Sequence, residues 1–164
     1  GCNMSSICAS LAVKKDVAAV LIFSDGKVVD KYVTRIRDKE ILKNTCRSTL
    51  GCAEIGVRRL KVLMEAMPDI DDAVFETDNK RVANWVRDDE ASDDCLDLFD
   101  KLMSELDELP VTYSFVFNSR PKAVPYAKES CLSAPKIGGL DISAFDGVDE
   151  KEKAEEEKVV EAEK

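Results

Sequence analysis

The stretch TCRSTLGCAEIGVRRLKVLMEAMPDIDDAVFETDNK, residues 45–80, changes its hydrophobic periodicity once along its length. Residues 48–67 predict an amphipathic helix, because one stripe at helical spacing is apolar and most charged residues lie off it. A proline ends this helix, and residues 72–77 then predict a short strand. Glu54 on the helix and Asp78 after the strand therefore place two carboxylates, 24 residues apart, on consecutive elements.

The segment before this stretch predicts three strands. Residues 17–23 (VAAVLIF) are continuously apolar, which is typical of a strand buried on both faces. The Asp-Gly pair at 25–26 is a strong hairpin signal, and residues 27–36 form the return strand. The imperfect alternation of that strand suggests a bulge or an edge position. A strand over residues 5–13 has weaker support, since its pattern is not strictly periodic.

Downstream of the opening stretch, helices alternate with a further strand. Residues 79–86 predict a helix that carries Trp85, and a second amphipathic helix follows from Ser92 to the residue before Pro110, with inward-facing positions that include Leu96. Residues 111–117 (VTYSFVF) alternate as a strand does, and a short helix follows over about 121–131. Helices between strands indicate an α/β domain with a mixed sheet and helices packed over it.

Length and charge set the domain organisation. The chain has 164 residues, enough for one domain and a tail, and we place the domain at 1–135 and a disordered or helical acidic tail, rich in Glu and Lys, at 136–164. The net charge is −9, and residues 1–132 still carry 19 basic and 23 acidic side chains. A domain that binds phosphates usually has a net basic face, so this one needs a local basic region.

Composition excludes several classes of protein. The chain has no histidine, which excludes Ser-His and Cys-His catalysis. The six cysteines form no CxxC pair, so a zinc site or a disulfide framework is disfavoured. No apolar run approaches the roughly 20 residues that span a bilayer. Charges at Lys14, Lys15 and Asp16 interrupt any secretory pattern, so we expect an intracellular protein in the reducing cytoplasm.

Four stretches together resemble the ribonuclease H-like superfamily. The first, AVLIFSDGKVVDKYVT, looks like the second and third strands of that fold, and the second, TCRSTLGCAEIGVRRLKVLMEAM, looks like its first helix with a Glu after a small residue. The third, VFETDNKRVANWV, resembles the strand that ends in Asp and the helix with a Trp. The fourth, VTYSFVFNSRPKAVPYAKES, resembles the closing strand and terminal helix. The resemblance covers about residues 5–131 and implies a mixed five-stranded sheet flanked by helices.

The resemblance also implies a site in which several carboxylates hold two Mg²⁺ or Mn²⁺ ions. Two of the four ligand positions fall on Glu54 and Asp78, which would be the catalytic and metal-binding residues if the site is active. The other two fall on Cys8 and Val124. A thiol is a poor Mg²⁺ ligand and a valine is none, so the sequence predicts a degenerate metal site.

Other carboxylates leave alternatives open. Asp25 could be the first-strand aspartate in another register, although only 29 residues then separate it from Glu54. Asp16 or Glu129 could move into a rearranged site. Structural explanations compete as well: Glu54 stands four residues before Arg58, at the spacing of an ion pair on one helix, and Asp78 could cap the helix that follows it.

Partner predictions follow from the charge pattern. Arg58, Lys80 and Arg81 are the candidate binding residues, because basic side chains cluster near them. Residues 88–108, however, contain ten acidic residues and one lysine, which disfavours tight binding of nucleic acid and favours a protein partner with a basic surface.

Three hypotheses remain at this point. The first is a catalytically degenerate domain that binds no cofactor and acts as an interaction module. One place for such a module is a nucleic-acid-processing assembly. The second is a weak Mg²⁺- or Mn²⁺-dependent ribonuclease that acts on the RNA strand of RNA–DNA hybrids. The third is an unrelated α/β domain, which a sheet order other than 3-2-1-4-5 would favour.

Overall fold

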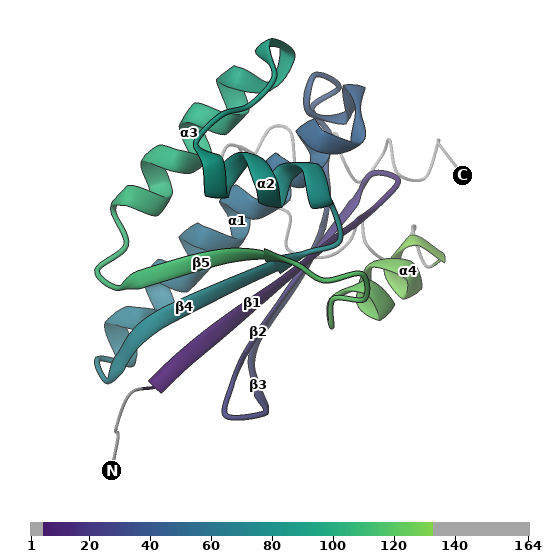
Figure 1. Ribbon diagram of the computed structural model, residues 1–164. Coiled ribbons are helices and arrows are strands. Elements are labelled where there is room, and N and C mark those ends of the chain that lie inside the picture. The colour runs from purple at the N-terminus through teal and green to yellow at the C-terminus, as the bar shows by residue number, and fades with distance from the viewer. Residues whose placement is uncertain (1–4, 133–164) are drawn as a thin grey trace, which may run out of the picture.

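A computed structural model of the chain describes residues 5–132, which form one mixed sheet with helices on both faces (Figure 1). The sheet has five strands in the order β3-β2-β1-β4-β5, as the first two hypotheses require. The strands are β1 (Ser5–Lys14), β2 (Val17–Ser24), β3 (Lys27–Arg35), β4 (Ile70–Thr77) and β5 (Thr112–Phe117). β1, β2 and β3 pair antiparallel, whereas β4 pairs parallel with both β1 and β5.

The helices are distributed unequally between the two faces of the sheet (Figure 1). They are α1 (Thr45–Ala66), α2 (Lys80–Asp88), α3 (Leu96–Asp107) and α4 (Val124–Leu132), with short 3₁₀ turns η1 (Ile41–Lys43) and η2 (Asp93–Cys95). The main core lies between the sheet and α1, with α2 and α3 contributing to it. α4 lies alone on the opposite face, over a smaller core that contains Ala12, Leu21 and Ala127.

The predicted hairpin between β2 and β3 forms as its turn residues dictate. Asp25 and Gly26 join β2 to β3 with φ angles of 53° and 77°, the left-handed values that a tight hairpin of this kind needs. β3 is an edge strand, and the register between β2 and β3 shifts between Ile22 and Phe23. Both features that the imperfect alternation of β3 suggested are therefore confirmed.

Close packing of α1 on the sheet depends on one glycine. A Cβ atom at Gly56 would lie 2.7 Å from Cδ2 of Leu11 on β1, closer than real Cβ contacts. The helix can therefore approach β1 only because this position lacks a side chain.

One predicted boundary and one predicted side-chain orientation need correction, and one region lies outside the described residues. The helix expected from Ser92 begins with the η2 turn, and α3 itself starts at Leu96. Leu96, predicted to face inward, is 39% exposed at the junction of η2 and α3. Of the predicted tail, residues 133–164 lie outside the described part of the chain.

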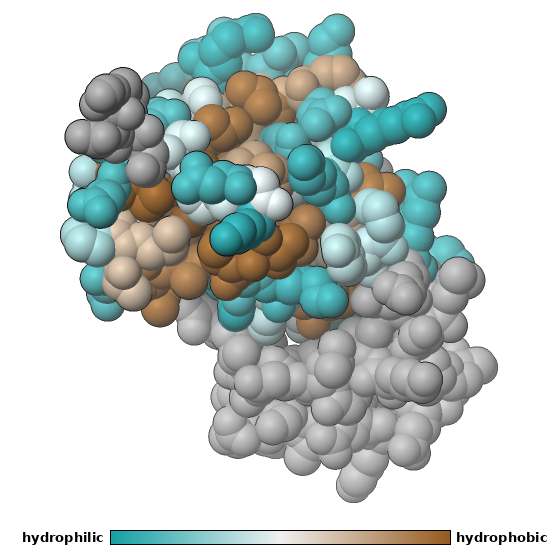
Figure 2. All heavy atoms as spheres, turned by 90° about the horizontal axis from the view of Figure 1, so that it is seen from below, coloured by the Kyte–Doolittle hydropathy of each residue, from teal (hydrophilic) through white to brown (hydrophobic). Residues whose placement is uncertain are grey.

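The surface mixes polar and apolar side chains. Seen from below, a central group of hydrophobic side chains is surrounded by polar ones (Figure 2). Within the described residues, no helix is both long enough and apolar enough to cross a membrane.

Candidate functional site

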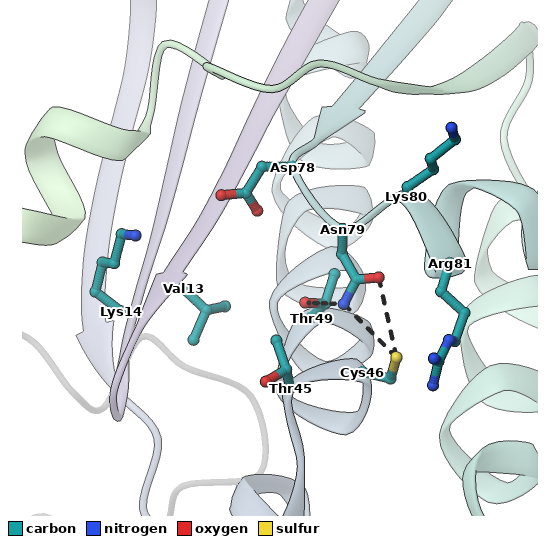
Figure 3. A pocket seen from close by; sticks show the side chains of 9 residues that line it. All are labelled: Val13, Lys14, Thr45, Cys46, Thr49, Asp78, Asn79, Lys80 and Arg81. Carbon is teal, nitrogen blue, oxygen red and sulfur yellow. Dashed lines mark hydrogen bonds between the residues drawn. The ribbon is translucent and has the colours of Figure 1, made fainter.

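A pocket of about 500 Å³ lies where β1 and β4 end (Figure 3). Because the two strands are parallel, their carboxyl ends meet at the same edge of the sheet. The starts of α1 and α2 complete the wall, so four elements converge on one opening. The lining residues are Val13 and Lys14 from β1, Thr45, Cys46 and Thr49 from α1, Asp78 and Asn79 after β4, and Lys80 and Arg81 from α2.

Asn79, rather than Asp78, caps the helix that follows β4. The Asn79 side-chain oxygen accepts a hydrogen bond from the backbone N–H of Val82 at 3.0 Å, and its side-chain nitrogen donates to Oγ1 of Thr49 at 3.2 Å. The explanation of Asp78 as the N-cap residue is therefore wrong: Asp78 is exposed, and its carboxylate lines the pocket (Figure 3).

Glu54 lies on a different side of α1, toward α3. Its Oε2 is 2.8 Å from Nη2 of Arg58 and 3.6 Å from Nζ of Lys101 on α3. Of the α1 residues that line the pocket, Thr49 is the nearest to Glu54 in sequence. Five residues of α-helix rotate a side chain by about 140° net, so a side chain at 54 points well away from one at 49. Thr49 and Asp78 line the pocket, whereas Glu54 joins α1 to α3.

Cys8 and Val124 occupy the other two predicted ligand positions and lie on the face of the sheet that α4 covers. Burial, reinforced by the charge of Glu76 and partly offset by Lys122, raises the pKa of the Cys8 thiol to about 12. The thiol is therefore protonated at neutral pH, and a sulfur ligand suits Mg²⁺ poorly in any case. Val124 is the first residue of α4 and packs against the smaller core.

Sequence reasoning missed Glu76, the buried acid of β4. Glu76 accepts hydrogen bonds on both carboxylate oxygens, at Oε1 from Nδ2 of Asn118 at 2.9 Å and at Oε2 from the backbone N–H of Lys122 at 3.0 Å. Beside it, Oγ of Ser10 accepts a hydrogen bond from the N–H of Ala123 at 2.9 Å. These bonds fasten the segment between β5 and α4 to the sheet. The period of two along β4 was the available signal, since it places residues 76 and 78 on one face.

The remaining carboxylates proposed for a rearranged site are dispersed. Asp16 pairs with Arg35 at 2.7 Å, and Asp25 lies in the β2–β3 turn at the other end of the sheet from the pocket. The side chain of Glu129 lies outside the described part of the molecule. Among the residues that the structure describes, no group of three or more His, Cys, Asp or Glu side chains is placed to hold a metal ion. This donor set does not fit a pair of Mg²⁺ ions.

The candidate binding residues also divide between two places. Lys80 and Arg81 line the pocket, with Nζ of Lys80 lying 5.9 Å from the centre of the Phe117 ring. Arg58 instead lies between α1 and α3, where its Nε is 3.5 Å from a carboxylate oxygen of Glu105. The three therefore do not form one binding surface.

Comparison with known proteins gives a fold but no family. No protein-family model matches the sequence, and no curated protein matches it. Several solved structures are similar. LC11-RNase H1, isolated from compost, is 12% identical over 78% of this chain and 92% of its own, with a TM-score of 0.57. The N-terminal RNase H domain of Rv2228c from Mycobacterium tuberculosis is 11% identical over 79% of this chain and 99% of that chain, with a TM-score of 0.52.

A third similar structure is RNase H1 from the halophilic archaeon Halobacterium salinarum. It is 12% identical, covers 77% of this chain and 98% of that chain, and has a TM-score of 0.52. The sheet order and the three likenesses agree, so the fold of this chain is ribonuclease H-like. The third hypothesis, an unrelated α/β domain, lacks the different sheet order that would have favoured it.

Proposed function

We propose that this chain is a ribonuclease H-like domain without metal-dependent catalysis, which acts as an interaction module in a nucleic-acid-processing assembly. One observation carries the proposal: of the nine residues that line the pocket at the sheet end, one is a carboxylate, Asp78, and three are cationic, Lys14, Lys80 and Arg81. Two divalent cations need several converging carboxylates, and three cationic side chains repel them instead. Glu54 is held by an arginine and a lysine, and both oxygens of Glu76 already accept hydrogen bonds.

A protein partner with a basic surface remains the partner we propose. Part of the acidic segment is neutralised within the domain, because Asp97 pairs with Arg47, and Glu105 and Glu108 pair with Lys61. Other acids of the segment stay exposed, and within the described residues they form no ion pair: Asp89, Glu90, Asp93, Asp100 and Asp107. Lysines and arginines on a partner would complement this surface and speed its association.

Metal titration tests the loss of chemistry. We expect no heat of binding by calorimetry, and no saturable shift of the Asp78 amide by NMR, when Mg²⁺ or Mn²⁺ is added to millimolar concentration. We also expect no hydrolysis of the RNA strand of an RNA–DNA hybrid. Robust metal-dependent hydrolysis that follows the protein through purification would overturn the proposal.

The alternative function is a weak metal-dependent ribonuclease, and the exposure of Asp78 in an open pocket favours it. Under that alternative, Asp78→Asn must abolish hydrolysis, and so must Glu54→Gln if Glu54 turns toward the metal. Activity that survives both substitutions would indicate a contaminating nuclease. The expected cytoplasmic location also stays a proposal. Four cysteines, Cys8, Cys46, Cys52 and Cys95, are free thiols, which a reducing compartment favours.

A further inference from the structure

The three cationic side chains of the sheet-end pocket are not neutralised by the domain itself. Within residues 5–132, no ion pair involves Lys14, Lys80 or Arg81, and Lys80 has only its contact with the Phe117 ring. The contrast with Arg47, which is held by a carboxylate and two backbone carbonyls, is clear. Asp78 supplies one negative charge, so the pocket keeps an excess of positive charge.

The backbone adds to this excess. α1 and α2 both begin at the pocket, and the amino-terminal end of a helix carries a partial positive charge. Neither helix has an acidic residue in its first turn, and α2 begins with Lys80 and Arg81. Cations at this end of a helix destabilise it. The helix dipole therefore disfavours cations at this position, whereas an anionic ligand would pair with them.

The chain contains a segment of complementary charge. Residues 149–164 hold eight acidic and four basic side chains, a net charge of −4, with three consecutive glutamates at 155–157. The described part ends at Leu132, in α4, and α4 packs against β1, the strand that brings Lys14 to the pocket. The 16 residues from 133 to 148 could span roughly 50 Å when extended, more than a small domain requires.

We propose that the carboxylates of residues 149–164 bind the sheet-end pocket as an intramolecular ligand. Glutamates of the tail then occupy the space between Lys14, Lys80 and Arg81, and they compete with any anion from outside for that space. A tethered ligand acts at an effective concentration in the millimolar range. Exposed carboxylate–cation contacts are individually weak and screened by salt, so the pocket exchanges between a tail-bound and an open state.

The test uses the full chain and a variant neutralised in the tail, Glu155→Gln with Glu156→Gln and Glu157→Gln. In ¹⁵N-labelled protein at low salt, the variant should shift the amides of Lys14, Asn79, Lys80 and Arg81 and leave core amides such as that of Phe75 unchanged. Raising NaCl to about 0.5 M should shift the same amides of the unmodified chain in the same direction, because the Debye length falls to a few ångströms.

Binding of a probe anion gives the second readout. Inorganic pyrophosphate should bind the variant about 2- to 5-fold more tightly than the unmodified chain, as expected for release of a competitor present at about one to four times its own dissociation constant. The matched control replaces tail lysines instead, Lys151→Gln with Lys153→Gln and Lys158→Gln, and should weaken pyrophosphate binding.

Two results would overturn the inference. One is that the amide signals of the pocket residues shift neither when the tail is neutralised nor when the salt concentration is raised. The other is a response that depends on protein concentration, since the tail would then be binding a second copy. Neither readout uses a divalent metal, so failure here is distinguishable from failure of the proposed function.

Discussion

Arg47 and Asp97 join the start of α1 to the start of α3 through two parallel hydrogen bonds. Nη1 of Arg47 donates to Oδ1 of Asp97 at 2.8 Å, and Nη2 donates to Oδ2 at 2.9 Å. The same guanidinium also donates to the backbone carbonyls of Glu40 and Asp94. Arg47 is buried, whereas Asp97 is largely exposed. The single guanidinium therefore donates hydrogen bonds to Glu40, Asp94 and Asp97.

Arg47→Ala should therefore destabilise the domain by about 2–3 kcal/mol, because two backbone carbonyls and the Asp97 carboxylate lose their donor and the packing of the buried side chain is lost. Denaturation in urea measures this free energy. Arg87→Ala is the matched control, since Arg87 also pairs with an aspartate, Asp88, but at the surface. The control should be indistinguishable from the unmodified chain. Equal losses for both variants would refute the role assigned to Arg47.

Acid should weaken the contact between α1 and α3. Hydrogen bonding from Arg47 lowers the pKa of Asp97 below its ordinary value of 3.8, and hydrogen bonding from Lys61 lowers the pKa of Glu105 below 4.5. A carboxylate with a lowered folded-state pKa stabilises the fold above its ordinary pKa and loses that stabilisation as pH falls through the folded value. We expect the melting temperature to fall steadily from about pH 4.5 downward, and Asp97→Asn with Glu105→Gln to flatten this dependence. An unchanged pH dependence in the double variant would contradict the assignment.

Two glycines of α1 should respond in opposite ways to alanine. Gly56→Ala places a Cβ atom 2.7 Å from Cδ2 of the fully buried Leu11, and such overpacking costs about 1–3 kcal/mol. At Gly51 the added Cβ would meet the half-buried Ile41 side chain at 3.0 Å, where the short η1 turn can yield. The gain in helix propensity, up to about 1 kcal/mol, then makes Gly51→Ala neutral or stabilising. Thermal melts of the two variants compare them directly, and equal destabilisation would show that α1 packs uniformly along its length.

Sequence patterns predicted the elements of the fold well and the orientation of single side chains poorly. Three elements were predicted from residues that are close together in the sequence. They are the strand at the apolar run 17–23, the Asp-Gly turn and the helix with the apolar stripe, and the structure contains all three. Glu54 shows the limit. Its position on a helix was predicted, but whether it faces the sheet end or α3 depends on where α3 packs, which no local pattern records.

The pocket was beyond sequence reasoning for the same reason. Lys14 and Lys80 are 66 residues apart in the sequence and line the same pocket only because β1 and β4 are parallel neighbours. Lys80 and Arg81 were proposed as binding residues from their charge, and the structure adds what they face. The helix cap was considered at Asp78, but it lies at Asn79. Either residue type can cap a helix, so the backbone geometry decides between two adjacent candidates.

Glu76 should hold α4 to the sheet, which is testable apart from any function. Glu76→Ala leaves Nδ2 of Asn118 and the N–H of Lys122 without their acceptors, at a cost of about 1–3 kcal/mol in unfolding free energy. Hydrogen exchange should locate the effect, with faster exchange at Ala123 and Ala127, while amides of α1 follow only the global change.

Asp72→Ala is the control on the same face of β4, because Asp72 accepts a hydrogen bond from the Thr112 hydroxyl at the exposed end of the strand. Glu76→Gln should fall between the two, since an amide oxygen replaces one acceptor but its NH₂ group cannot accept from Lys122. Uniformly faster exchange in Glu76→Ala, with no excess at α4, would mean that α4 is held by the small apolar core alone.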